Sequence, residues 1–243
     1  MKLKATLQCT TSPPTVLLLD GLKGGCGKSF VARIVAYEFD RHQQPWEGLD
    51  GDNANAHLNR FAGRGASVSR FDGSHPTEAY DAVLDAIGST PHSILVDLPA
   101  GIGSLEASYP MMCMATAASG HRILRMFVMT DGHDAVQQLS ASAPSFPHCD
   151  TVAVLNKRSA KADDFALWYG SKTRHAMLAG GGREISFPRL HEPTQKFADN
   201  KFVSFAELLE LPDMPTSVRF NLRHFLNICS GQLDPLLQFG NRS

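Results

Sequence analysis

The stretch that decides the fold of this chain is Lys23-Gly24-Gly25-Cys26-Gly27-Lys28-Ser29. It follows the apolar, β-branched residues 15–19 and precedes a helix-like pattern over residues 30–39. Successive glycines let backbone N–H groups turn inward around phosphate oxygens without a clash of Cβ atoms. The stretch therefore predicts a phosphate-binding loop at a turn from strand to helix.

Each residue type in the loop suits one part of a phosphate ligand. Gly24, Gly25 and Gly27 supply the cradle of N–H groups, and the N-terminus of the following helix adds its positive dipole end. Lys28 can reach the terminal phosphates, and the Ser29 hydroxyl can ligate Mg²⁺. The alternative is a glycine-rich turn with incidental lysines.

The usual loop pattern has a glycine five positions before Gly27, where this chain has Leu22. The stretch instead fits x-K-G-G-x-G-K-[ST] and resembles the deviant Walker A loop of the ParA/MinD family of dimeric ATPases, in the SIMIBI class. The resemblance implies a homodimer that forms on ATP binding, with Lys23 of each subunit reaching the other's phosphates. It also implies that the nucleotide contacts Gly24, Gly25, Cys26, Gly27, Lys28, Ser29 and Phe30.

The composition is that of one large globular domain. The chain has 243 residues, of which 43% are hydrophobic and 19% charged. We expect a single ATPase domain over residues 1–243, with an N-terminal extension at 1–14 and a C-terminal helical segment packed on the domain at about 212–243.

The five cysteines are scattered along the chain, which argues against a disulfide framework. The net charge is −1, which argues against a basic field over the whole molecule. A cytoplasmic protein is expected, because no apolar run approaches about 18 residues and no hydrophobic signal core precedes residue 14.

Short apolar runs alternate with helical patterns along the chain. The expected strands are 15–19, 46–49, 93–96, 123–129, 151–155 and 184–187, and the expected helices are 30–39, 76–87, 134–141, 160–178 and 204–211, with a helix and turn at 194–203. This alternation predicts an α/β fold with a doubly wound, mostly parallel sheet and helices on both faces. Residues 217–228 show a further helical spacing; packing on the domain is the favoured reading, and a membrane-binding helix the alternative.

Two aspartate-containing stretches follow predicted strands. Asp97 ends the aliphatic run Ile94-Leu95-Val96, which puts a carboxylate at the carboxyl edge of a buried strand, where it can hold a Mg²⁺-bound water; an aspartate that only caps a turn is the alternative. The Pro-Ala-Gly after it resembles the MinD switch loop. The order Asp50-Gly51-Asp52 is similar to the D-x-D-P-Q stretch of ParA-like ATPases, although Asn53-Ala54 replaces Pro-Gln. That similarity implies that Asp52 orients the attacking water and that Asp50 lies near the metal's outer shell; ordinary turn chemistry is the alternative.

The resemblance further implies base contacts from Asn156, after the strand at 151–155, and from Pro188, after the strand at 184–187. A cap or turn role for Asn156 is equally consistent with its place. The densest basic region comprises Lys157, Arg158, Lys161, Lys172, Arg174 and Arg183, offset by nearby acids. The resemblance implies non-specific DNA as a further partner, bound through such basic residues; the alternative is a solvated mixed-charge surface.

The motifs together with the resemblance imply a Mg²⁺-dependent ATP hydrolase in which Lys23, Lys28 and Asp52 are catalytic, and Ser29, Asp50 and Asp97 serve the metal. The settings implied by the resemblance are plasmid partition, cargo positioning or an accessory role in conjugative transfer, with an unidentified stimulating or cargo protein. The alternatives are a regulatory adaptor that hydrolyses slowly or not at all, and a metabolic enzyme on the same fold. An iron-sulfur carrier is disfavoured because Cys113 and Cys149 lack a glycine-rich cysteine context.

Overall fold

The computed structural model describes residues 13–21, 24–52, 56–63, 66–72, 75–99, 105–158 and 165–238. Its centre is a seven-stranded sheet in the order β3-β2-β4-β1-β5-β6-β7, in which every neighbouring pair is parallel. The strands are β1 (Thr15–Asp20), β2 (Trp46–Asp50), β3 (Ser67–Arg70), β4 (Ser93–Asp97), β5 (Arg122–Met129), β6 (Asp150–Asn156) and β7 (Arg183–Phe187). The predicted doubly wound parallel sheet is confirmed.

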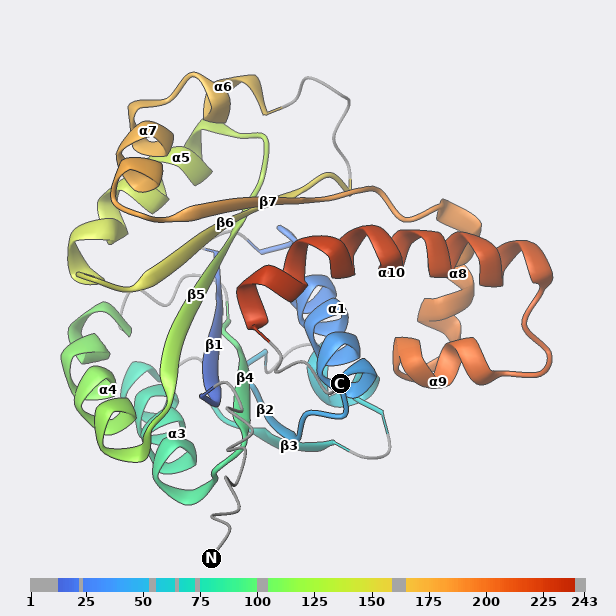
Figure 1. Cartoon of the computed structure of the whole chain (residues 1–243), viewed down its shortest axis with the longest axis horizontal. Coiled ribbons are helices and arrows are strands. Elements are labelled where there is room, and N and C mark those ends of the chain that lie inside the picture. Colours follow the sequence, from blue (N-terminus) through green and yellow to red (C-terminus); the bar gives the residue numbers. More distant parts are fainter. Residues whose placement is uncertain are drawn as a thin grey trace, which may run out of the picture.

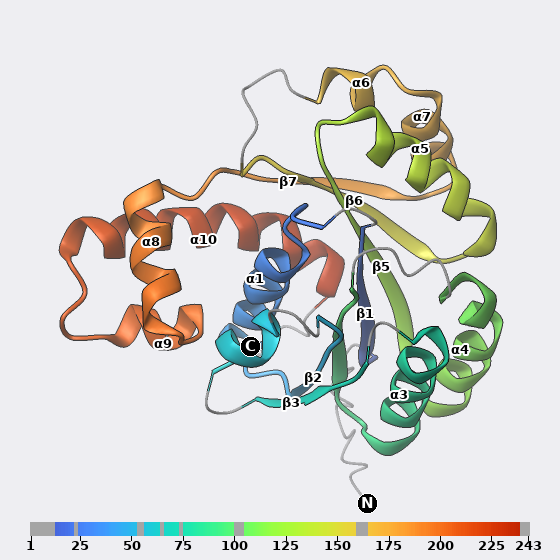
Figure 2. The ribbon, with the colours of Figure 1, turned by 180° about the vertical axis from the view of Figure 1, so that it is seen from behind.

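Helices cover both faces of the sheet (Figures 1 and 2). One layer contains α1 (Lys28–Arg41), α2 (His57–Phe61), α8 (Glu192–Lys201), α9 (Phe205–Glu210) and α10 (Thr216–Leu237). The opposite layer contains α3 (Pro76–Ser89), α4 (Leu105–Ser119), α5 (His133–Ser142), α6 (Ala166–Tyr169) and α7 (Lys172–Ala179), with a 3₁₀ turn at Ala143–Ser145. Because the central strands are buried on both sides, they read as continuous apolar runs rather than alternating ones.

The central strand β1 divides its side chains between the two layers. Leu17 and Leu19 join the cluster formed with α1, α9 and α10, whereas Val16 and Leu18 join the cluster formed with α3 and α4. All four side chains are at most 1% exposed. This two-sided burial fixes β1 and, with it, the start of the loop that follows.

Two helices and one strand were not expected from the sequence. β3 has a single apolar residue, Val68, and pairs only with β2 at the edge of the sheet, so it lacks the apolar signal of a buried strand. α4 carries apolar side chains around much of its circumference and has Pro110 inside it, which obscures a helical period. α2 is only one turn long. The helix expected at 160–178 is α6 and α7, separated near Gly170, with residues 159–164 outside the described ranges.

α10 lies along the layer that contains α1, and its apolar face is buried there (Figure 1). An ion-pair cluster joins the two helices: Arg41 Nη2 donates to Glu38 Oε2 at 2.6 Å and to Asp234 Oδ1 at 2.5 Å. The hydroxyl of Ser230 also donates to the buried Glu38 carboxylate. Burial raises the pKa of Glu38, so these donors offset the cost of keeping its charge inside the protein.

Leu222→Ala is expected to lower the free energy of unfolding by about 2–5 kcal/mol, because this α10 side chain is fully buried in the cluster shared with α1. Urea denaturation of the full chain measures it. Phe220→Ala is the matched control, since Phe220 lies on the same helix and is 67% exposed. Equal effects of the two substitutions would show that α10 does not pack on the domain in solution.

Candidate functional site

The turn between β1 and α1 is fixed by a buried amide on a neighbouring strand. Gly27, which precedes α1, has φ 98°, and a Cβ at this residue would lie 2.1 Å from Asn156 Nδ2. That same nitrogen donates to the carbonyl oxygen of Cys26 at 2.9 Å. Only glycine combines this left-handed backbone with such close approach. The end of β6 thus holds the loop in position.

Asn156 therefore has a definite structural contact. Its Oδ1 accepts from the backbone N–H of Arg158 at 3.2 Å, so both ends of the amide are engaged within the protein, and the residue is 7% exposed. The expected contact with a nucleobase stays a prediction. Pro188, the other expected base contact, directly follows β7. The carbonyl oxygen of Phe187, the last residue of β7, accepts a hydrogen bond from the N–H of Lys157 at 3.0 Å, so the chain just before Pro188 is tied to the residue after Asn156.

The Lys28 ammonium lies inside the loop. Its Nζ donates to the Gly21 carbonyl oxygen at 2.8 Å, and the residue is 7% exposed. The N–H of Gly21 in turn donates to Asp20 Oδ1 at 2.6 Å. Arg125, buried in β5, donates to Asp20 Oδ2 from Nε at 2.9 Å and from Nη2 at 2.6 Å. A chain of contacts thus runs from β5 through the end of β1 to the lysine.

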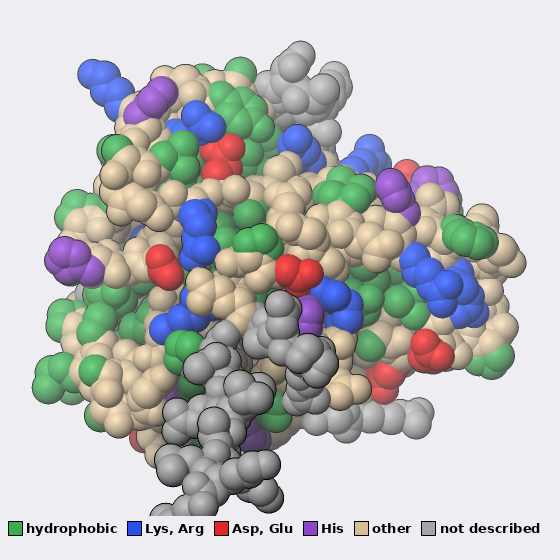
Figure 3. Space-filling model, viewed as in Figure 1, with side chains coloured by type: hydrophobic (Ala, Val, Ile, Leu, Met, Phe, Trp, Pro, Cys, Tyr) green, Lys and Arg blue, Asp and Glu red, His purple; other side chains and the backbone are tan. Residues whose placement is uncertain are grey.

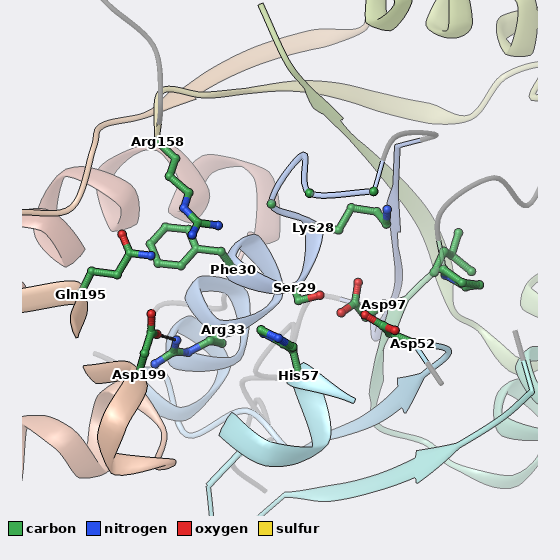
Figure 4. A pocket seen from close by; sticks show the side chains of 15 residues that line it. Lys28, Ser29, Phe30, Arg33, Asp52, His57, Asp97, Arg158, Gln195 and Asp199 are labelled. Atoms are coloured by element: carbon green, nitrogen blue, oxygen red, sulfur yellow. Dashed lines mark hydrogen bonds and ion pairs between the residues drawn. The ribbon is translucent and has the colours of Figure 1, made fainter. Parts of the chain in front are cut away.

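The two aspartate stretches meet because β2 and β4 are neighbours. Asp50 and Asp97 are register partners at the carboxyl ends of these strands. Asp50 accepts from the N–H of Asp52 at 3.1 Å and from the N–H of Asn59 at 2.9 Å, so its carboxylate organises the chain after β2. Asp52 lines the cavity described below, near Ser29 and Asp97 (Figure 4).

Asp97 is a buried carboxylate whose oxygens are not satisfied within the described chain. It is 1% exposed, and both of its carboxylate oxygens are buried without a hydrogen-bond partner in the described part of the chain. Burial raises its pKa to about 7; repulsion from Asp50 adds to this, while the neighbouring Ser29 hydroxyl and Lys28 favour the charged form. Unsatisfied carboxylate oxygens beside a hydroxyl are the hard oxygen ligands that Mg²⁺ takes. The residues present therefore fit a magnesium site formed by Asp97 and Ser29.

A cavity of about 400 Å³ opens over the loop and the start of α1. Figure 4 shows Lys28, Asp97 and Asp52 near one end of the cavity, and Gln195 and Asp199 near the other. The expected site residues that line it are Gly24, Gly25, Gly27, Lys28, Ser29, Phe30, Asp52 and Asp97. Cys26, Asp50, Asn156 and Pro188 lie outside its lining, and Lys23 lies outside the described residues. A phosphate loop at the end of β1, with an aspartate at the end of adjacent β4, is the arrangement of a P-loop NTPase.

The sequence did not single out four lining residues: Arg33, His57, Gln195 and Asp199. Arg33 could have been found, since it lies four residues after Ser29 on one face of α1. His57 begins α2, and burial, followed by the charge of Arg60, lowers its pKa. Gln195 and Asp199 belong to no motif, and α8 brings them to the cavity from the far end of the chain.

The predicted basic region is more mixed than its sequence suggests. Arg174 Nε pairs with Glu184 at 2.7 Å, and Arg183 Nη2 pairs with Asp150 at 3.5 Å. Lys161 lies outside the described ranges. On the face shown in Figure 3, Lys and Arg side chains are interspersed with acidic and apolar ones. DNA binding stays a prediction, and two of the arginines expected to contact DNA are paired with acidic side chains of the same chain.

No family model matches this chain. It is similar to Protein MobD of Acidithiobacillus ferrooxidans, at 22% identity over 215 residues, which covers 88% of this chain and 93% of that protein. Among the described residues, every helix is too short or too polar to span a bilayer.

Solved structures with similar folds include a nucleotide-binding protein from Archaeoglobus fulgidus in complex with ADP. Its sequence is 15% identical to that of this chain. The match covers 77% of this chain and 86% of that protein's chain, with a TM-score of 0.48. The cell division protein FtsY of Thermotoga maritima is 20% identical; the match covers 68% of this chain and 59% of that protein's chain, with a TM-score of 0.48. The chloroplast FtsY of Physcomitrella patens is 19% identical; the match covers 61% of this chain and 52% of that protein's chain, with a TM-score of 0.41.

The raised pKa of Asp97 predicts how stability changes with pH in the absence of nucleotide and Mg²⁺. Between about pH 4 and 7 the folded protein keeps a proton that the unfolded chain has lost, so the free energy of unfolding falls as pH rises through this range. Asp97→Asn is expected to remove this decline and to be more stable at pH 8, by on the order of 2–4 kcal/mol.

Urea denaturation at several pH values, with a chelator present, measures the Asp97 effect. Asp85→Asn, at an exposed position on α3, is the control and is expected to follow the original protein. If Asp97→Asn shows the same pH slope as the original protein, the Asp97 carboxyl does not titrate abnormally.

Proposed function

We propose that this protein is a Mg²⁺-dependent ATPase of the ParA/MinD type, which dimerises around ATP and acts as a nucleotide-controlled switch. The observation that carries the proposal is the pair of buried Asp97 oxygens that have no partner in the described chain, beside Ser29 and at the start of α1. Such oxygens are costly to bury unless a cation or donor satisfies them. The deviant loop with its early lysine supports the finer assignment.

The residues of the site divide the work of phosphoryl transfer to water, in which positioning and charge stabilisation dominate. The N–H groups of Gly24, Gly25 and Gly27 hold the phosphate oxygens, helped by the dipole of α1. Lys28 exchanges its contact with the Gly21 carbonyl for the terminal phosphates. When bound, Mg²⁺ supplies charge neutralisation at the phosphates, with Ser29 and Asp97 to hold it.

Asp52 is the residue proposed to orient the attacking water. It lines the cavity near Asp97 and Ser29, and its backbone is held by two hydrogen bonds: its N–H donates to Asp50, and its carbonyl oxygen accepts from Ala56 at 2.8 Å. Asp50 thus positions Asp52 through its backbone, and the place near the metal's outer shell that the family resemblance implies for Asp50 stays a prediction.

For the biological setting we propose an accessory role in conjugative transfer, supported by the similarity to MobD. In this proposal Lys23 of one subunit contacts the triphosphate bound to the other. ATP binding therefore favours the dimer over the monomer, and the state of assembly depends on the nucleotide. A stimulating or cargo protein would read that state.

Asp52→Ala is expected to lower the turnover number for ATP about 100-fold or more, with a much smaller effect on ATP affinity, since the residue acts on water rather than on the phosphates. Phosphate release and equilibrium titration of ATP measure the two quantities. Asp85→Ala, on exposed α3, is the matched control. An original protein that binds ATP but turns over no faster than Asp52→Ala would support the non-hydrolysing adaptor instead.

Lys23→Ala is expected to weaken ATP-dependent dimerisation at least tenfold while it changes ATP binding to the monomer by less than about threefold, since a single charged hydrogen bond is lost across subunits. Sedimentation with a non-hydrolysable ATP analogue, together with nucleotide titration, separates the two effects. Lys172→Ala, an exposed lysine on α7, serves as control. Equal losses in both measurements would place Lys23 in its own subunit's site.

A further inference from the structure

The cavity continues past Phe30, away from the phosphate loop, to side chains that the proposed hydrolysis does not use. Arg33 comes from α1, and Gln195 and Asp199 come from α8 (Figure 4). Gln195 and Asp199 are four residues apart on one helix, so they share a face. This end of the cavity therefore has its own polar groups, brought together from the two ends of the chain.

Arg33 is held rigidly at this end. Its guanidinium carbon lies 3.9 Å from the centre of the Phe61 ring and 4.5 Å from that of Phe205. Its Nη1 donates to Asp199 Oδ1 at 2.7 Å, while Nε and Nη2 are buried without a partner among the residues described. The residue is 4% exposed. An arginine so enclosed cannot swing away, and it fixes the orientation of the Asp199 carboxylate.

Asp199 itself is accessible from the cavity. Its side chain is 44% exposed, and its Oδ2 has no hydrogen bond to any described residue. A carboxylate only accepts hydrogen bonds, so a ligand that fits here must bring donors, such as hydroxyl groups. The pairing with Arg33 offsets the negative charge, which makes this carboxylate compatible with a polyphosphate bound in the same cavity.

The position suits the sugar of a nucleotide. Arg33 lies one helical turn after Ser29, about 6 Å along the axis of α1. The sugar is the next part of a nucleotide after its phosphates, and its vicinal hydroxyls are paired donors. We propose that Asp199, oriented by Arg33, accepts hydrogen bonds from the sugar hydroxyls and makes the site selective for nucleotides that carry both the 2′- and the 3′-hydroxyl over those that lack one of them. This inference rests on the proposed function, because the phosphates must occupy the loop.

The simplest competing account gives the Arg33 to Asp199 pair a structural role only, as a clamp that holds α8 against α1. The two accounts differ in one measurable quantity. A clamp affects every ligand alike, whereas a sugar contact affects only ligands that carry the hydroxyl. Discrimination between nucleotides that differ by one hydroxyl, and its loss when Asp199 is substituted, therefore separates the two accounts.

The test is calorimetric titration of the full chain with ATP, 2′-deoxyATP, 3′-deoxyATP and tripolyphosphate, each with Mg²⁺. We expect at least one deoxynucleotide to bind about tenfold more weakly than ATP, the effect of losing a hydrogen bond to a charged acceptor. Asp199→Asn keeps the shape of the side chain and is expected to reduce that ratio to about two or less, with tripolyphosphate binding unchanged. Lys196→Ala, on the same helix with a 73% exposed side chain, is expected to keep the original ratio.

The outcomes are separable. If the original protein binds ATP and both deoxynucleotides equally, the sugar contact is wrong while the proposed nucleotide site stands. An Asp199→Asn protein that keeps the full ratio, with or without lower stability, likewise overturns the contact and supports the clamp. If neither ATP nor tripolyphosphate binds the original protein, the proposed function itself fails. Should Asp199→Asn not fold, Asp199→Ser takes its place with the same expected loss of the ratio, and equal binding of the three nucleotides by the original protein still overturns the contact.

Discussion

Charge buried at the carboxyl edge of a parallel sheet is the constraint on which the rest of this structure depends. Asp20 at the end of β1 is held by Arg125, and its contact with the Gly21 N–H fixes the point where the loop begins. Asp97 at the end of β4 has no such partner in the described chain. The first carboxylate is satisfied within the protein, and the second is oriented for a ligand from outside. The fold thus separates a structural charge from a functional one within two neighbouring strands.

The loop is shaped from the other side by Asn156. Because its amide contacts Cys26 and packs closely against Gly27, the end of β6 and the start of α1 form one rigid unit. Lys28 lies within this unit, against the Gly21 carbonyl. A phosphate ligand would therefore meet N–H groups that are already in place, which reduces the entropic cost of binding.

Arg33 joins the far end of the cavity to α2 and to α8 and α9, the last two of which lie in the right-hand part of Figure 1. It contacts Phe61 of α2, Phe205 of α9 and Asp199 of α8, so α2 and the distant pair of consecutive helices α8 and α9 meet at one guanidinium. Burial lowers the pKa of Arg33, while its ion pair with Asp199 opposes that effect. Such a buried, aromatic-lined cation orders its neighbours even where its net contribution to stability is small.

The sequence by itself determined the class of the sheet and six of its seven strands, the phosphate loop and the aspartate that faces it. These features are encoded locally: apolar runs specify buried parallel strands, and the glycines with Lys28 and Ser29 specify the turn between a strand and a helix. Elements without a strong local period, β3 at the sheet edge and α4 with its broad apolar surface, could not be found in this way.

Only the tertiary structure decided which polar groups are already satisfied and which face the cavity. Asp50 and Asp97 look alike in sequence, since each ends a strand, yet backbone N–H groups occupy the oxygens of the first and leave those of the second unpaired. The pairing of Arg33 with Asp199 spans 166 residues and follows from the packing of α8 on α1. Local sequence reports the chemical type of a side chain, whereas its partners depend on segments that folding brings together from elsewhere in the chain.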